Sequence, residues 1–151
     1  MQPTVICVTH SPAETEAVAA RLAAVLRAGD VVALFGGLGM GKTAFVRGMA
    51  EGRGLDAEVS SPTFALVHEY GGSPPLVHFD MYRIGCWDDL YSTGFFDYLD
   101  TGAILAVEWS ENIEAALPDN AVRVCFERLA ENERRITIYG WEAAGVENTG
   151  D

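Results

Sequence analysis

The sequence predicts an α/β fold built on one mixed β-sheet, with a parallel centre and antiparallel hairpin strands, flanked by helices. Residues 31–35 form a continuous apolar run of strand length, and a glycine-rich loop and a helix follow it. Two later pairs of strand-like runs each surround a turn cluster, which is typical of hairpins. At 151 residues the chain has the size of one domain, which we place at residues 1–142, followed by a frayed tail at 143–151.

Composition and charge exclude several classes of protein. With 49% hydrophobic and 21% charged residues, the chain is neither disordered nor fibrous. No apolar run approaches the roughly 18–20 residues that a membrane helix needs, and the start of the chain shows no signal-peptide pattern. We therefore expect a cytoplasmic protein without membrane contact. The 22 acidic and 10 basic residues give a net charge of −12, which disfavours direct nonspecific binding to nucleic acid.

The first strand and helix are predicted by local signals near the start of the chain. Residues 5–8 form a short β-branched run. Ser11 then provides an N-cap, with a proline at the next position and a capping-box glutamate three residues later. Apolar residues at helical spacing continue this pattern, and Gly29 provides a left-handed stop. We expect a helix over residues 12–28.

The remaining elements are predicted from hydrophobic period, turn clusters and helix signals. In chain order they are a helix at 43–51, strands at 64–70 and 76–82 around the turn cluster 71–75, short helices and loops at 85–100, a buried strand at 103–109 with Ser110 as a helix cap, and strands at 122–126 and 135–139 around the turn 130–133. No internal repeat is visible in the sequence.

Residues 36–43, GGLGMGKT, match the phosphate-loop pattern GxxxxGK[ST] at every fixed position. The preceding strand and the following helix make a chance glycine-rich turn the weaker interpretation. Backbone amides would face the phosphates, Lys42 would reach the β and γ oxygens, and Thr43 would offer its hydroxyl to Mg²⁺. We therefore predict a single P-loop NTPase-like domain that binds nucleotide and Mg²⁺. The other loop residues expected to contact the nucleotide are Gly37, Leu38, Gly39, Met40 and Gly41.

Two carboxylates follow apolar strand runs. Asp80 ends the run 76–79, and Glu108 ends the run 104–107. Burying a carboxylate there is costly unless it is paired or bound to a metal, and a P-loop needs an acidic residue to hold Mg²⁺ or orient water. We predict that Asp80 and Glu108 are catalytic and linked to Mg²⁺. For each of them, a turn-capping acid is the alternative.

Other polar residues carry weaker signals. Thr63, in SSPTF, could face a γ-phosphate as part of a switch loop, and an ordinary Ser/Pro turn is the alternative. The histidines and cysteines show no metal-ligand spacing, so we expect structural or surface roles for the histidines and buried, reduced, inert cysteines. These residues are His10, His68, His78, Cys7, Cys86 and Cys125.

Four sequence blocks together resemble one family. GGLGMGKTAFVRG, SSPTFALVHEY, HFDMYRI and LAVEWSENI, in this order and spacing, are similar to the TsaE (YjeE) family of bacterial P-loop ATPases, from Ser11 to about Arg135. The resemblance implies a part in making threonylcarbamoyladenosine at position 37 of tRNA. It further implies binding of ATP and Mg²⁺, ATP hydrolysis, association with a TsaB–TsaD heterodimer, and only indirect involvement with tRNA. The sequence offers no obvious arginine finger, so we expect slow ATP hydrolysis without those partners.

The resemblance also implies roles for single residues. Thr43 and Glu108 would be linked to Mg²⁺, Asp80 would be a catalytic or Mg²⁺-linked carboxylate, and Thr63 would belong to a switch. Trp109 would belong to the nucleotide-side motif, with a place in the core as the alternative.

The family places the nucleotide base near the start of the first helix and near an arginine entering the last hairpin. Here this implies Ser11, Thr15 and Arg134. The chain has Gly37 where the family often has Asp. It also has Asn-Glu at 132–133 where a glycine often precedes the arginine, which leaves Arg134 and Arg135 as alternatives.

The sequence also bears on other nucleotide-binding functions. A GTPase needs an Asn-Lys-x-Asp guanine reader, and the only lysine is already in the phosphate loop, so ATP is the expected nucleotide. A small-molecule kinase is one alternative, although residues 85–100 contain none of the arginines that a phosphate-covering lid usually has. A nucleotide-gated binding module with incidental turnover is another.

Overall fold

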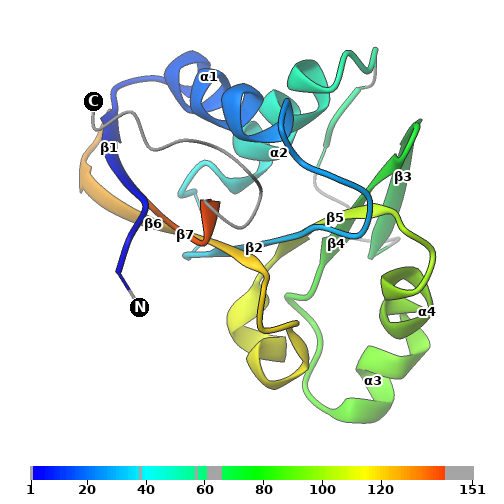
Figure 1. Ribbon diagram of the computed structural model, residues 1–151. Coiled ribbons are helices and arrows are strands. Elements are labelled where there is room, and N and C mark those ends of the chain that lie inside the picture. The colour runs from blue at the N-terminus through cyan, green and yellow to red at the C-terminus, as the bar shows by residue number, and fades with distance from the viewer. Residues whose placement is uncertain (1, 38, 57, 61–65, 142–151) are drawn as a thin grey trace.

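The protein folds into one seven-stranded sheet with helices on both faces (Figure 1). The computed structural model describes residues 2–37, 39–56, 58–60 and 66–141. In chain order the elements are β1 (Val5–Thr9), α1 (Pro12–Ala23), β2 (Val31–Phe35), α2 (Lys42–Gly52), β3 (Val67–Gly72), β4 (Pro75–Asp80), α3 (Trp87–Ser92), α4 (Phe95–Leu99), β5 (Ile104–Glu108), the 3₁₀ helix η1 (Ser110–Ala116), β6 (Val122–Ala130) and β7 (Glu133–Tyr139). Helices α1 and α2 cover one face, and α3, α4 and η1 cover the other.

The sheet has the predicted mixed topology. Its strand order is β1-β7-β6-β2-β5-β4-β3. Strands β6, β2, β5 and β4 are parallel neighbours, whereas β1, β7 and β3 pair antiparallel at the two ends. Because β2 and β5 are central, their side chains are almost all buried, which explains why they read as continuous apolar runs. The fold class and both hairpins are confirmed.

Helix α1 begins where predicted but ends five residues early. Ser11 accepts a hydrogen bond from the Glu14 amide at 3.1 Å, as an N-cap does. At the other end, the Arg53 guanidinium donates to the carbonyl oxygens of Ala23 and Leu26 at 3.2 and 2.9 Å. These bonds satisfy carbonyls that a longer helix would bond internally, so the chain leaves the helix at Ala23. The predicted end at residue 28 was wrong.

Two further predictions need correction. Ser110 does not cap a helix from outside: it is the first residue of η1, and its hydroxyl donates to the Val107 carbonyl at 2.8 Å.

All three cysteines are free thiols, but Cys7 and Cys125 are only partly buried and Cys86 is exposed. Cys86 is exposed because it stands at the N-cap of α3, outside the apolar core. The boundary predicted at residue 142 stays a prediction, since 142–151 lie outside the described residues.

Within the described ranges, no helix is both long enough and apolar enough to cross a membrane.

Candidate functional site

The glycine-rich loop joins the end of β2 to the start of α2. Gly36, Gly39 and Gly41 have φ values of +146°, +72° and +97°, a backbone conformation that glycine adopts readily. Gly41 is the N-cap of α2, and no side chain caps this end. The first amides of α2 are therefore available to an anion, and the positive end of the helix dipole points the same way.

Lys42 is held inside the site rather than extended into solvent. Its side chain is only 5% exposed, its Nζ donates to the Gly36 carbonyl, and Nζ lies 3.9 Å from the centre of the Trp109 ring. Burial lowers the pKa of the Lys42 ammonium, and the negative charges of nearby Glu108, Glu111 and Asp80 oppose this shift. The ammonium is thus pre-positioned beside the loop.

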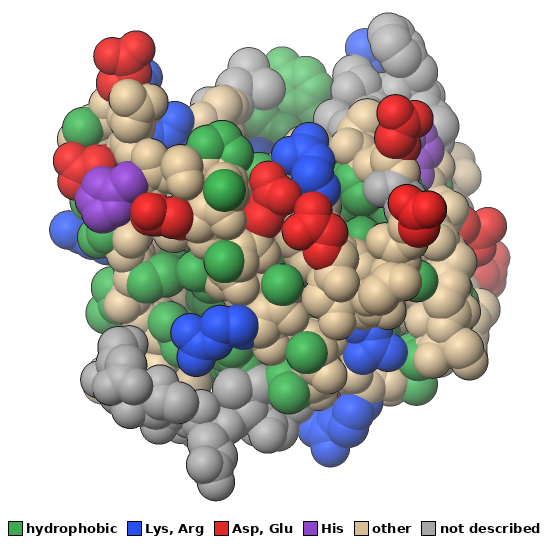
Figure 2. Space-filling model, turned by 90° about the horizontal axis from the view of Figure 1, so that it is seen from above, with side chains coloured by type: hydrophobic (Ala, Val, Ile, Leu, Met, Phe, Trp, Pro, Cys, Tyr) green, Lys and Arg blue, Asp and Glu red, His purple; other side chains and the backbone are tan. Residues whose placement is uncertain are grey.

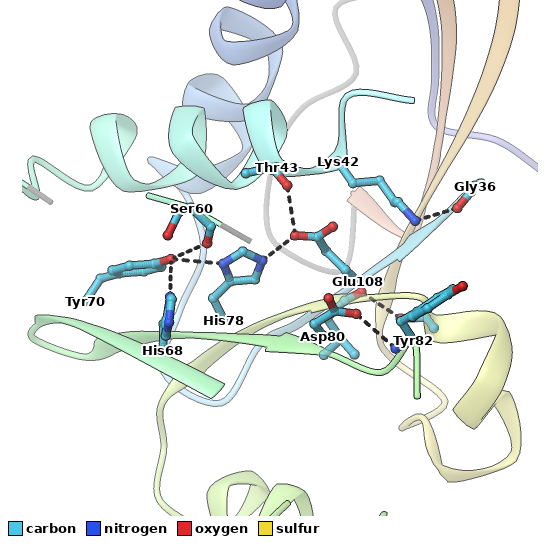
Figure 3. Close-up of polar contacts among 12 residues, drawn as sticks. Gly36, Lys42, Thr43, Ser60, His68, Tyr70, His78, Asp80, Tyr82 and Glu108 are labelled. Atoms are coloured by element: carbon cyan, nitrogen blue, oxygen red, sulfur yellow. Dashed lines mark hydrogen bonds and ion pairs between the residues drawn. The ribbon is translucent and has the colours of Figure 1, made fainter. Parts of the chain in front are cut away.

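The two predicted carboxylates lie next to each other at the carboxyl ends of β4 and β5. Asp80 stands directly opposite Glu108 in the strand register, and both side chains are buried, at 5% and 4% exposed. Glu108 Oε2 accepts a hydrogen bond from the Thr43 hydroxyl at 3.3 Å, and Asp80 Oδ1 accepts one from the Tyr82 amide at 2.9 Å (Figure 3). Parallel strands end at the same sheet edge, which is why two distant segments converge here.

A cavity of about 520 Å³ connects the loop to the carboxylates. Its walls are residues 39–44 on one side and Asp80, Tyr82, Glu108 and Trp109 on the other. The structure therefore brings the predicted phosphate contacts and the predicted Mg²⁺ ligands to one cavity. Trp109 fits both of its predicted roles: its ring faces Lys42 and the Tyr82 ring, and it also packs against the core beneath.

A second cavity of about 200 Å³ lies on the other side of the loop. Ser11, Thr15 and Arg134 all line it, together with Gly39 and Gly41. The three residues that the resemblance assigns to the base are thus gathered beside the phosphate loop.

Of the two alternative arginines, Arg134 contacts the loop. Its Nη2 donates to the Gly39 carbonyl at 3.1 Å, whereas Arg135 pairs with Glu127 at 3.0 Å on the hairpin. The geometry favours Arg134 over Arg135 at this cavity.

The other predicted contacts differ in what the structure says of them. Met40 is partly buried against the core, and Gly37 is exposed at the loop surface. Leu38 and Thr63 lie outside the described residues.

His78 was missed by the sequence reasoning. It is fully buried, its Nε2 lies 2.6 Å from Glu108 Oε2, and its Nδ1 lies 3.0 Å from the Tyr70 hydroxyl. A signal was present, because residues two apart on a strand share a face and His78 stands two before Asp80. The sequence does not show which residue His78 contacts, so its role at the site could not be predicted from it.

The donor set fits Mg²⁺ bound together with phosphate. Among the described residues, no group of three or more His, Cys, Asp and Glu side chains could hold a metal ion by itself. Asp80, Glu108 and the Thr43 hydroxyl supply hard oxygen ligands. Mg²⁺ is typically held by one or two carboxylates plus substrate phosphates and water, so this partial set is what such a site requires.

Comparisons with known proteins identify one family. The family described as "Threonylcarbamoyl adenosine biosynthesis protein TsaE" matches residues 9–136. The protein named tRNA threonylcarbamoyladenosine biosynthesis protein TsaE from Bacillus subtilis is 41% identical, over 86% of this chain and 82% of its own. The protein of the same name from Treponema pallidum is 35% identical, over 87% and 98%. The crystal structure of Bacillus subtilis YdiB superposes with a TM-score of 0.76 at 36% identity, covering 89% of this chain and 83% of YdiB.

Proposed function

Because the chain belongs to the TsaE family, we propose that it is an ATP-binding and ATP-hydrolysing subunit of the machinery that makes N6-threonylcarbamoyladenosine at position 37 of tRNA. The relatives' names place them in that pathway. The observation that carries the ATPase part is one cavity with the phosphate loop on one wall and the Asp80–Glu108 pair on the opposite wall.

Phosphate binding is assigned to the start of α2. The uncapped amides and Lys42 would meet the phosphate oxygens, since an ammonium is a point charge that stabilises them without fixed geometry. Its bond to the Gly36 carbonyl and its place over the Trp109 ring hold Lys42 close to the loop before nucleotide arrives. Little side-chain entropy then remains to be lost on binding.

The cation would be held by Thr43 and Glu108, with Asp80 beside them. Bound Mg²⁺ supplies charge neutralisation and orientation of the transferred phosphoryl group. The Thr43 hydroxyl proton points to Glu108 Oε2, which leaves the lone pairs of Thr43 Oγ1 for the cation. The Asp80 carboxylate would then orient an attacking water.

The adenosine part is assigned to the second cavity. Arg134 bridges this cavity and the phosphate loop through its bond to the Gly39 carbonyl, and it also donates to three carbonyls of the β6–β7 turn. The hairpin and the loop are thereby tied together on the side where Ser11 and Thr15 lie.

The lining of the cavity supports a proposal of slow intrinsic hydrolysis that depends on partners. Among the described residues, no arginine lines the cavity that holds Asp80 and Glu108. Phosphoryl transfer often recruits an arginine from another subunit, worth about 10³–10⁵ in rate. We assign the completing contact to a TsaB–TsaD heterodimer, with tRNA involved only through it. On the face drawn in Figure 2, the described basic side chains stand in separate groups and do not form a continuous basic surface for RNA.

The test is steady-state phosphate release by the purified protein with TsaB and TsaD added singly and together, at several salt concentrations. We expect a low rate for the protein alone and a changed rate with the pair, with a salt dependence if charges guide docking. A fast rate indifferent to every partner would reject the proposal and indicate a self-sufficient ATPase. Phosphate transfer to a metabolite would indicate a small-molecule kinase.

A further inference from the structure

Glu108 ends a line of hydrogen-bonded side chains that runs across the sheet from its edge strand β3 to the cavity. The Tyr70 hydroxyl on β3 contacts His78 Nδ1 on β4 at 3.0 Å, and His78 Nε2 contacts Glu108 Oε2 on β5 at 2.6 Å (Figure 3). The Tyr70 hydroxyl also donates to the Ser60 carbonyl at 3.2 Å. No step proposed so far for ATP binding or hydrolysis uses His78 or Tyr70.

The hydrogen bond between His78 and Glu108 has one possible donor. A carboxylate oxygen only accepts hydrogen bonds, so His78 Nε2 carries the proton at that contact. Burial raises the pKa of the Tyr70 hydroxyl, the Ser60 bond opposes the shift and the Glu108 charge adds to it, which keeps the hydroxyl protonated. The Tyr70 hydroxyl has one proton, so it either donates this proton to His78 Nδ1, or accepts a hydrogen bond from Nδ1–H while it donates to the Ser60 carbonyl or to His68 Nδ1. In both arrangements, Nε2–H points at Glu108.

The strand register explains how the histidine reaches the glutamate. His78 stands opposite Ala106 on β5, two residue pairs before Asp80 stands opposite Glu108. The small Ala106 side chain leaves room for the imidazole to lean along the strand towards residue 108. His78 and Thr43 therefore contact the same oxygen, Oε2. Within the described part of the chain Oε1 has no hydrogen bond, and Glu108 lines the cavity.

We propose that His78 is a positioning residue, which holds the Glu108 carboxylate in the orientation that a Mg²⁺–nucleotide complex requires, while Tyr70 fixes the imidazole ring. The proposal rests on the proposed ATPase function. A glutamate has rotatable side-chain bonds, and the two hydrogen bonds on Oε2 remove that freedom before the cation binds. Loss of partners that orient a metal-linked group commonly costs about 10–100-fold in metal affinity or activity.

The sharpest test compares two amides at position 78. The amide nitrogen of His78→Gln can reach the place of Nε2 and donate to Glu108, whereas His78→Asn can replace only the Nδ1 side, near Tyr70. We expect His78→Asn to raise the Mg²⁺ concentration for half-maximal ATP hydrolysis by about 10–100-fold. In His78→Gln this concentration should lie much closer to the wild-type value. Affinity for ATP in EDTA should stay at the wild-type value in both variants. His68→Asn, which changes a neighbour of Tyr70 that does not contact Glu108, is the matched control.

Two measurements separate positioning from a merely structural role. In a Glu108→Gln background, His78→Asn should cause no further loss of turnover, because the group through which it acts is already changed. In the nucleotide-free protein, NMR should show a His78 Nε2–H resonance protected from exchange, which shifts in Glu108→Gln and not in His68→Asn. If His78→Asn fails to fold, Tyr70→Phe provides the test, with a smaller rise in the Mg²⁺ requirement.

The outcomes distinguish this inference from the proposed function. Wild-type protein that binds no ATP would overturn the proposed function and the positioning role with it. Active wild-type protein would overturn the positioning role alone if His78→Asn had an unchanged Mg²⁺ requirement, if its loss were additive with that of Glu108→Gln, or if Nε2–H were unprotected.

Discussion

The two ends of helix α2 both depend on glycine, but for opposite physical reasons. At the N-terminal end, among the described residues, a Cβ placed on Gly39 would meet no atom within 4 Å, and one on Gly41 would meet only Thr15 Cγ2 at 4.0 Å. These loop glycines are needed because their φ values are positive. Further along the helix, a Cβ on Gly48 or Gly52 would lie 2.2 or 2.4 Å from a carbonyl oxygen of α1.

This difference divides α2 into a binding end and a packing end. The carbonyls that approach Gly48 and Gly52 belong to Glu16 and Ala20, one turn apart on α1. The two helix backbones therefore touch at Gly48 and Gly52, because no side chain separates them there. At the loop end the space stays open, as a site for a ligand requires. Substitutions at the two ends should affect different properties.

The largest expected effect is the loss of ATP binding in Lys42→Ala. The substitution removes the charge facing the phosphates, and truncating one member of a buried charge pair costs about 2–5 kcal/mol of binding free energy. The free energy of unfolding without nucleotide should change by less, because the variant also relieves the cost of burying an ammonium. Calorimetric titration with ATP and denaturant unfolding are the two measurements. Wild-type ATP affinity together with wild-type turnover would refute the phosphate-loop assignment.

The next effect is a loss of stability in Gly48→Ala. Overpacking costs about 1–3 kcal/mol, and a methyl group against a backbone carbonyl, which cannot rotate away, belongs at the high end of that range. Alanine favours a helix over glycine by only about 1 kcal/mol, so the variant should be destabilised overall. Urea unfolding measures the change. An unfolding free energy equal to that of wild type would mean that α1 and α2 can move apart without loss of stability, and that close packing does not require glycine at position 48.

The smallest expected effect is that of Gly37→Ala on stability. Gly37 has no positive φ, and a Cβ there would meet nothing within 4 Å. We expect the free energy of unfolding to stay within about 0.5 kcal/mol of wild type, the usual range for a surface substitution. The same urea titration checks this, side by side with Gly48→Ala. A loss as large as that of Gly48→Ala would show that the loop end is also limited by space.

The features that depend on neighbouring residues could be predicted before the structure was known. The strand at 31–35, the loop GGLGMGKT and the helix after it were predicted within one residue. The mixed sheet followed from apolar runs and turn clusters. The convergence of Asp80 and Glu108 was also predictable, because an acid after a buried strand stands at the sheet edge where the loop lies. These features depend on local period, local turns and the geometry of a parallel sheet.

The tertiary structure alone decided the features that join distant residues. His78 and Glu108 are 30 positions apart in the sequence, and so are Arg53 and the Ala23 carbonyl at the end of α1. Arg134, which contacts the loop where Arg135 does not, is 95 positions from Gly39. The closeness of α1 to Gly48 belongs to the same group. Propensity and periodicity act over a few residues. The partner of a buried histidine, the donor to a helix-end carbonyl and the space around a glycine are set only when packed elements bring remote side chains together.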